Sequence, residues 1–134
     1  MAVTCASPFG ETLAAVRAGL AEAGFGVITE VDLSATLRQK IGADVPAEVI
    51  LGACNPRFAY EAITAEPSIA ALLPCNVVVR SAGDSTVVEA FDPAAMAALA
   101  AGEDGVLADL AVKVRQRLSM ALARVSTPAG QTEE

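Results

Sequence analysis

Apolar residues recur at helical spacing near both ends of the chain. One stripe predicts an amphipathic helix over Pro8 to Ala23, with Ser7 as its N-cap and Gly24 as its C-terminal stop. Its members are Phe9, Leu13, Val16 and Leu20. A second stripe predicts a long final helix, and its members are Leu107, Leu110, Val114, Leu118 and Ala121. Each helix therefore has one apolar side to bury against another layer.

Elsewhere the pattern is that of strands and short helices. Alternating or β-branched apolar runs predict five strands, over residues 2–6, 25–31, 48–54, 75–80 and 86–91, the last two joined by a turn at Gly83 and Asp84. Short helices are predicted over residues 33–41, 56–66 and 93–101, with one further turn over 68–73 and a break over 102–105. Each of the three follows a capping residue, Asp32, Asn55 or Asp92.

The order of these elements indicates the fold class. It is roughly β-α-β-β-β-β-α, with the short helices inserted. We predict an α+β fold with one antiparallel or mixed sheet and helices largely on one face, because two layers are the simplest way to bury the apolar stripes. We expect a single domain over residues 1–125 and a disordered polar tail over residues 126–134.

Composition narrows the class of protein. The chain of 134 residues is 54% hydrophobic, but its apolar runs are far shorter than the roughly 18 residues that a transmembrane helix needs. Its first residues lack the basic and apolar regions of a signal peptide. The net charge of −7 disfavours binding to phosphate backbones. We therefore expect a soluble, cytoplasmic protein that binds neither membranes nor nucleic acids.

Three cysteines and no histidine limit the possible chemistry. An odd, small number of cysteines in a chain without a leader predicts free thiols in a reducing compartment. Without histidine, Cys–His and Ser–His–Asp catalysis and imidazole zinc sites cannot be built from this chain alone. The sequence therefore assigns neither an enzyme activity nor a cofactor.

Two Cys-Asn pairs form the best candidate site. Cys54 and Asn55 lie between a predicted strand and a helix, and Cys75 and Asn76 begin the next strand. Unpaired N–H groups at a helix start can stabilise a thiolate or hold an anion, and the intervening helix can return the chain to Cys54. Alternatively, both cysteines are small buried residues, Asn55 is only a helix cap and Asn76 only satisfies a turn. Cys5 has no companion motif and is expected to pack in the core.

The same segments carry a family resemblance. The stretches GFGVITE at residues 24–30, LGACNP at 51–56 and LPCNVVV at 73–79 resemble the domain-of-unknown-function 302 family. Asp92 and Pro93 before a methionine-containing helix, and the long last helix, extend the resemblance to about residues 1–124. It implies a compact α+β fold with a curved, mostly antiparallel sheet of TATA-binding-protein-like architecture, and a homodimer. It implies no activity.

Three functions stay open at this stage. The first is a small-ligand or thiol-based binding or redox module centred on Cys54 and Cys75. The second is a non-enzymatic homo-oligomeric or partner-binding domain whose cysteines are structural. The third is thiolate metal binding, but two sulfurs without histidine are few for zinc, so we predict no metal site. Acidic residues that could approach the cysteines are Glu48, Glu61, Glu66, Glu89 and Asp92, although a catalytic pair requires a separation that the sequence does not give.

Overall fold

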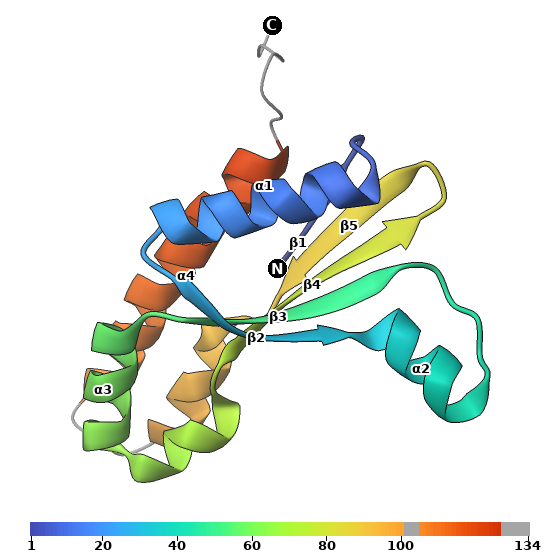
Figure 1. Cartoon of the computed structure of the whole chain (residues 1–134). Coiled ribbons are helices and arrows are strands. Elements are labelled where there is room, and N and C mark those ends of the chain that lie inside the picture. The colour runs from blue at the N-terminus through green and yellow to red at the C-terminus, as the bar shows by residue number, and fades with distance from the viewer. Residues whose placement is uncertain (101–104, 127–134) are drawn as a thin grey trace, which may run out of the picture.

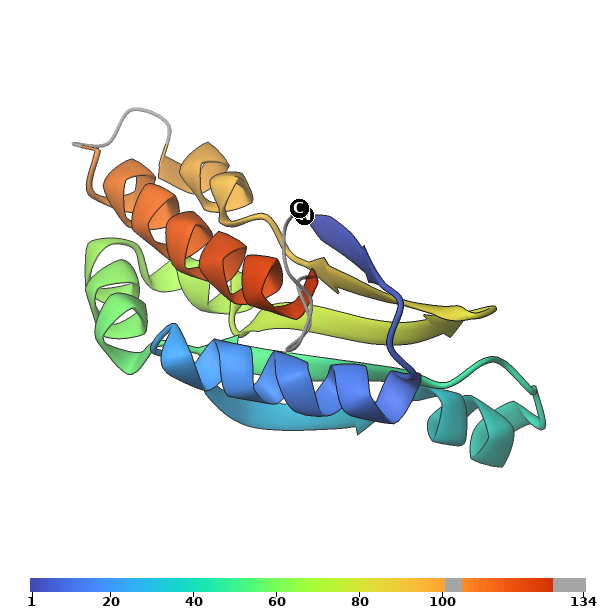
Figure 2. The same ribbon diagram turned by 90° about the horizontal axis from the view of Figure 1, so that it is seen from above.

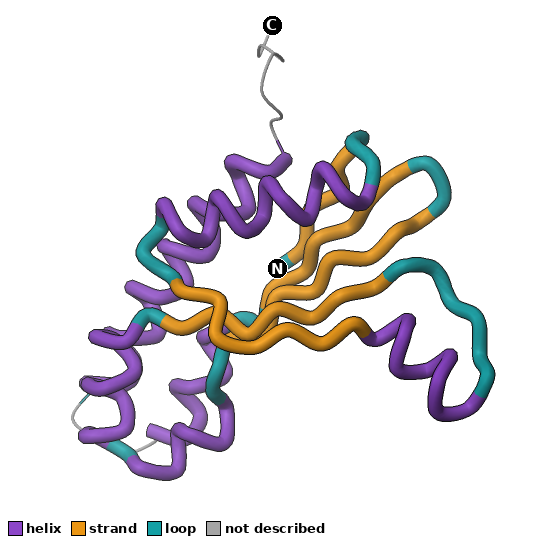
Figure 3. Tube along the Cα trace, viewed as in Figure 1, coloured by secondary structure: helices purple, strands orange, loops and turns teal. Residues whose placement is uncertain are grey.

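The structure, a computed structural model, describes residues 1–100 and 105–126. Five strands form one antiparallel sheet in the order β1-β5-β4-β3-β2, and the sheet is curved (Figure 3). The strands are β1 (Ala2–Cys5), β2 (Gly26–Asp32), β3 (Glu48–Cys54), β4 (Cys75–Ala82) and β5 (Ser85–Ala90). The predicted α+β fold with a curved antiparallel sheet is confirmed. Residues 102–104 of the predicted break and 127–134 of the predicted tail lie outside the described residues.

Two long helices cover one face of the sheet. Helices α1 (Phe9–Glu22) and α4 (Val106–Ser126) lie side by side across it (Figures 1 and 2). All five members of the apolar stripe predicted for the last helix are buried. The sheet contributes buried residues that pair across β3 and β4 and face the same side. These pairs are Val49 with Val79, Leu51 with Val77, and Ala53 with Cys75. The core therefore lies between the sheet and these two helices.

The start of α1 differs from the prediction that Ser7 is its N-cap. Pro8 occupies the cap position with an extended backbone (φ −63°, ψ 161°), and no side chain caps the helix. The Ser7 carbonyl instead accepts hydrogen bonds from the hydroxyls of Thr12 and Thr86, at 3.2 and 2.8 Å. Because proline fixes φ but leaves ψ free, the chain turns into the helix one residue later than the cap-then-proline pattern suggests.

The shorter helices begin where their capping residues predict. Helix α3 (Pro56–Ala65) follows Asn55, and a 3₁₀ turn, η1 (Pro67–Leu72), replaces the predicted helical turn that leads into β4. The segment after Asp92 is also a 3₁₀ helix, η2 (Pro93–Ala100), and Asp92 accepts a hydrogen bond from the Ala94 N–H at 2.9 Å. This alanine-rich segment has no one-sided apolar stripe, so its sequence does not favour an α-helix over a 3₁₀ helix.

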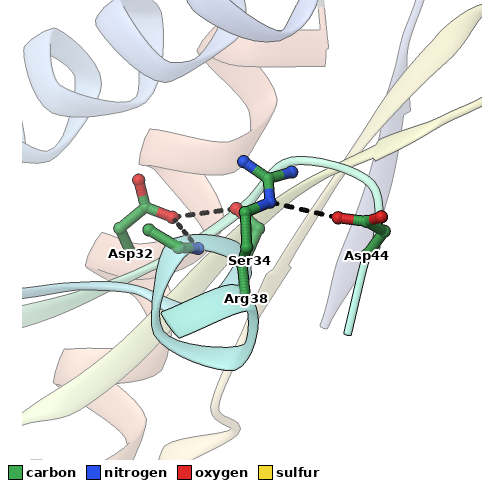
Figure 4. A network of polar contacts seen from close by, with 5 residues as sticks. Asp32, Ser34, Arg38 and Asp44 are labelled. Carbon is green, nitrogen blue, oxygen red and sulfur yellow. Dashed lines mark hydrogen bonds and ion pairs between the residues drawn. The ribbon is translucent and has the colours of Figure 1, made fainter. Parts of the chain in front are cut away.

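Helix α2 (Leu33–Ile41) lies at the opposite end of the sheet from α3 (Figure 1). Asp32 caps it by accepting hydrogen bonds from the Ala35 N–H and the Ser34 hydroxyl, at 2.9 and 2.8 Å, and Arg38 pairs with Asp44 just beyond the helix (Figure 4). The N–H and hydroxyl that Asp32 accepts from lower the pKa of its carboxyl group. None of the residues of α2 is buried, although Leu33, Leu37 and Ile41 recur at helical spacing.

No helix in the described ranges 1–100 and 105–126 is both long enough and apolar enough to cross a membrane.

Candidate functional site

A small apolar hollow lies where β3 ends and β4 begins, between that end of the sheet, α3 and α4. Its apolar walls include Phe25, Phe58, Leu73, Met96, Leu110 and Val114. The space not filled by atoms is about 380 Å³, and part of it is open to solvent. Because this volume includes open solvent, the hollow itself has room for only a small group.

Both cysteines of the Cys-Asn pairs line this hollow. Cys54 is the last residue of β3 and is partly exposed, whereas Cys75 is the first residue of β4 and is 4% exposed. In the ladder between the two strands, Cys75 stands opposite Ala53, the residue before Cys54. The antiparallel pairing of β3 with β4 therefore brings the two thiols to one end of the sheet.

The two thiols differ in their surroundings. Burial raises the pKa of the Cys75 thiol to about 11, and the nearby charge of Cys54 raises it further as the smaller cause. At neutral pH Cys75 is consequently protonated, and a protonated thiol is neither a nucleophile nor a good metal ligand. Of the two cysteines, Cys54 is the more exposed residue.

Asn55 also lines the hollow, and its side chain caps α3. Its Oδ1 accepts hydrogen bonds from the N–H groups of Arg57 and Phe58, at 3.1 and 3.2 Å, and its backbone carbonyl accepts one from Ala59 at 2.9 Å. Pro56, the first helical residue, has no N–H. The unpaired N–H groups that the sequence led us to expect beside Cys54 are therefore already used by Asn55, and the start of α3 offers no free backbone donors to an anion.

Asn76 and Cys5 lie outside the hollow. Asn76 follows the buried Cys75 on β4, so alternation along the strand turns it to the other face of the sheet, where it is exposed. Its backbone carbonyl accepts a hydrogen bond from Phe91 at 2.9 Å. Cys5 is 2% exposed, burial raises its pKa, and its Sγ lies 3.6 Å from the Val125 carbonyl oxygen. The structure thus brings together three of the four candidate residues, Cys54, Asn55 and Cys75.

Arg117 of α4 lies beside the hollow, although it is not part of the apolar stripe that predicts this helix. Its guanidinium lies 5.5 Å from the centre of the Phe58 ring, and its Nη1 donates a hydrogen bond to the Ala23 carbonyl at 3.1 Å. These contacts connect α4 with α3 and with the end of α1. Since Arg117 and Ala23 are 94 positions apart in the chain, no local sequence signal predicts this connection.

The structure explains why the LGACNP stretch has a glycine at position 52. Gly52 is buried in β3, and a Cβ at this position would lie 2.0 Å from Thr29 Oγ1 and 2.7 Å from Pro74 Cγ. Pro74 directly precedes Cys75, so the absence of a side chain at Gly52 lets the start of β4 pack closely against β3. This close packing fixes the position of Cys75 relative to Cys54.

The acidic residues that were candidates for a carboxylate site have other partners or positions. Glu66 caps η1 by accepting from the Ser68 N–H, Glu89 pairs with Arg80, and Asp92 pairs with Arg115. Among the residues that the structure describes, none that lines the hollow is acidic. Within the part of the chain that the structure describes, no three Cys, Asp or Glu side chains come together in a way that could hold a metal ion.

Comparisons with known proteins agree with the resemblance noted in the sequence. A family model described as "Domain of unknown function DUF302" matches residues 1–125. Among solved structures, the chain is similar to the crystal structure of an uncharacterized conserved DUF302 protein from Bacillus stearothermophilus, with a TM-score of 0.85 and 25% sequence identity. The match covers 93% of this chain and 96% of that chain. No curated protein matches the sequence.

Proposed function

Because the chain belongs to the DUF302 family, whose function is unknown, we propose its function from the hollow alone: it is a small-ligand-binding module in which Cys54 is the accessible thiol. Binding pockets are typically concave and mostly apolar, with a few polar groups that orient the ligand. Here the polar groups are the two thiols and the Asn55 amide. One observation carries the proposal, namely that Cys54 and Cys75, from separate strands, border the same apolar hollow.

The ligand part of the proposal is tested by methyl NMR. The chain has three methionines, and Met96 lines the hollow whereas Met120 is exposed on the outer side of α4. We expect small apolar fragments to shift the Met96 methyl signal and to leave the Met120 signal in place. If no fragment at millimolar concentration moves Met96 more than Met120, the hollow is not a binding site.

The thiol part is tested by alkylation with iodoacetamide and peptide mapping. We expect Cys54 to react in the folded protein, while Cys5 and Cys75 react only after unfolding in urea, because both are buried and their pKa values are raised. Cys54→Ser should abolish labelling of the folded protein, and Cys75→Ser should preserve it. Equal protection of all three cysteines would mean that the thiols are structural.

A second candidate function is a homodimeric or partner-binding domain with structural cysteines. The observation in its favour is the exposed apolar surface at the β2 end of the molecule. Ile28 and Val31 of β2 are 61% and 43% exposed, and Ile41 at the end of α2 is 72% exposed. Sedimentation equilibrium tests this candidate: a dimer that Ile41→Lys dissociates would support it, and a monomer at 100 µM or above would contradict it.

We also propose that the protein works in a reducing compartment such as the cytoplasm. All three cysteines are free thiols in the structure, and disulfides form mainly outside that compartment. Trapping thiols with an alkylating agent at cell lysis should recover all three cysteines reduced. Recovery of an oxidised cysteine would contradict this proposal.

A further inference from the structure

The basic residues of this acidic protein differ in whether they form ion pairs. Five of its nine basic residues form ion pairs with carboxylates, and they are Arg17, Arg38, Arg80, Arg115 and Arg124. The other four make no ion pair within the described residues. Three of these, Arg57 on α3 and Lys113 and Arg117 on α4, belong to the two helices that flank the hollow, and Lys40 lies on α2 at the far end of the sheet.

Arg117 is held at the hollow by its neighbours. The Phe58 ring that it stacks on is itself part of the wall. Gly24, with a φ of +92°, leaves room for it: a Cβ there would lie 3.0 Å from Arg117 Nη1 and 3.3 Å from Asn55 Nδ2. The guanidinium and the Asn55 amide therefore both lie beside Gly24. Among the described residues only Nη1 of Arg117 donates a hydrogen bond, so the N–H groups on Nη2 and Nε stay available to a ligand.

Arg57 adds a second cation on the other side of Asn55. Asn55, Pro56 and Arg57 line an open surface recess, and Asn55 also lines the hollow, so the two spaces adjoin. Glu61 lies one helical turn beyond Arg57 but forms no ion pair with it among the described residues. Lys113 precedes Arg117 by one turn and lies on the same side of α4. Two guanidinium groups, with Lys113 one turn away on α4, thus lie beside an apolar hollow that no carboxylate of the described residues lines.

We infer that the ligand of the hollow has a small apolar body and an anionic end, as in a short-chain carboxylate, with Arg117, Arg57 and the Asn55 amide at the anionic end. This inference rests on the proposed function, because it names the class of ligand for the same hollow. Guanidinium groups bind carboxylates through paired N–H donors, which gives both energy and orientation. The cations, and not the start of α3, supply the attraction, since Asn55 already occupies the N–H groups of that helix start.

Two alkylating agents that differ only in charge test the inference. Iodoacetate and iodoacetamide both react as the Cys54 sulfur attacks the CH₂ carbon, displaces iodide and forms a thioether, with the thiol proton passing to the buffer. We expect the ratio of the iodoacetate rate to the iodoacetamide rate to be about threefold to tenfold higher at Cys54 in the folded protein than at the same cysteine in urea, the range expected for a unit charge several ångström away. Raising the salt concentration to 0.5 M should remove most of this preference.

Three variants test whether the preference for iodoacetate arises from the arginines beside the hollow. Arg117→Gln and Arg57→Gln should each lower the rate ratio toward the value in urea, and Arg57→Gln keeps the test valid if loss of Arg117 perturbs the fold. Lys40→Gln removes the same charge from the far end of the sheet and should leave the ratio unchanged. Isobutyrate should also slow the reaction with iodoacetamide more than isobutyramide does at equal concentration.

The possible outcomes separate the inference from the proposed function. If Cys54 reacts with neither reagent, the accessible thiol of the proposed function is absent. If it reacts with both, but the ratio equals that in urea or falls equally in Lys40→Gln, the proposed function stands and the anionic ligand is refuted. Equal protection by isobutyrate and isobutyramide would refute it in the same way.

Discussion

The buried thiol of Cys75 makes the stability of this protein depend on pH in the alkaline range. The pKa of the thiol is about 11 in the folded protein against 9.0 for a cysteine free in solution. Between these values the folded protein keeps a proton that the unfolded chain has lost, so the free energy of unfolding falls as the pH rises. A difference of two pKa units corresponds to about 3 kcal/mol, present in full below about pH 9 and lost by about pH 11.

The comparison that isolates this effect is between the native chain and Cys75→Ala. Urea unfolding of both proteins, in reductant and at constant ionic strength, gives their difference in stability at each pH. We expect this difference to fall by about 2–3 kcal/mol from pH 8.5 to pH 11.5. Other groups that titrate in this range, Cys5 among them, occur in both proteins and cancel. Removal of the sulfur from the core shifts the curve for the variant by a constant amount and leaves its slope unaffected.

Cys54→Ala is the matched control. Burial is the larger cause of the raised pKa of Cys75 and the charge of Cys54 the smaller, so this variant should keep most of the pH dependence. Curves for the native chain and Cys75→Ala that stay parallel from pH 8.5 to pH 11.5 would refute the reasoning. They would mean that the Cys75 thiol ionises as freely in the folded protein as in the unfolded chain.

Three substitutions test the packing that holds the site together. Asn55→Ala should lower the free energy of unfolding by about 1 kcal/mol in urea, whereas Asn55→Asp keeps the cap; equal losses in both would rule out capping as the cause. Gly52→Ala should lower the thermal midpoint far more than Gly26→Ala, because the new Cβ meets side-chain atoms at 2.0 and 2.7 Å in the first case and only an atom at 3.9 Å in the second. Leu118→Ala removes a side chain with 0% exposure and should cost about 2–5 kcal/mol in urea, and a cost below 1 kcal/mol would contradict its place in the core.

Local interactions account for what the sequence predicts well. Asp32, Asn55 and Asp92 each accept the backbone N–H bonds expected of a capping residue, because a cap involves only the next three residues. Strand β3 has the bounds that were predicted, Glu48–Cys54, because its alternating pattern and the capping residue Asn55 that follows it are local signals. Ser7 shows the limit of the same rule, because the backbone at Pro8 decides where the helix begins.

Contacts between distant segments account for what the sequence does not predict. The similarity of the two Cys-Asn pairs suggests that Asn55 and Asn76 share a role. However, Cys75 points into the core, so alternation along β4 turns the Asn76 side chain away from the hollow. The stacking of Arg117 on Phe58 joins helices whose relative placement no pattern of periodicity fixes. The two Cys-Asn pairs thus reveal site residues at the strand ends, Cys54, Asn55 and Cys75. They do not reveal the arginines beside the hollow, Arg57 on α3 and Arg117 on α4.

The position of the hollow follows from the topology of the sheet. Strands β3 and β4 are antiparallel neighbours, so the end of one and the start of the other necessarily lie together, and the connection through α3 and η1 must fold back over that edge. Gly52 lets Pro74 pack against β3, which places one thiol under the helices and leaves the other at the opening. The architecture alone therefore produces an apolar hollow with two unequal thiols. The choice of ligand then depends on side chains that the sheet does not constrain, Arg57 and Arg117, and substitution of these two residues should change selectivity for charge while the fold persists.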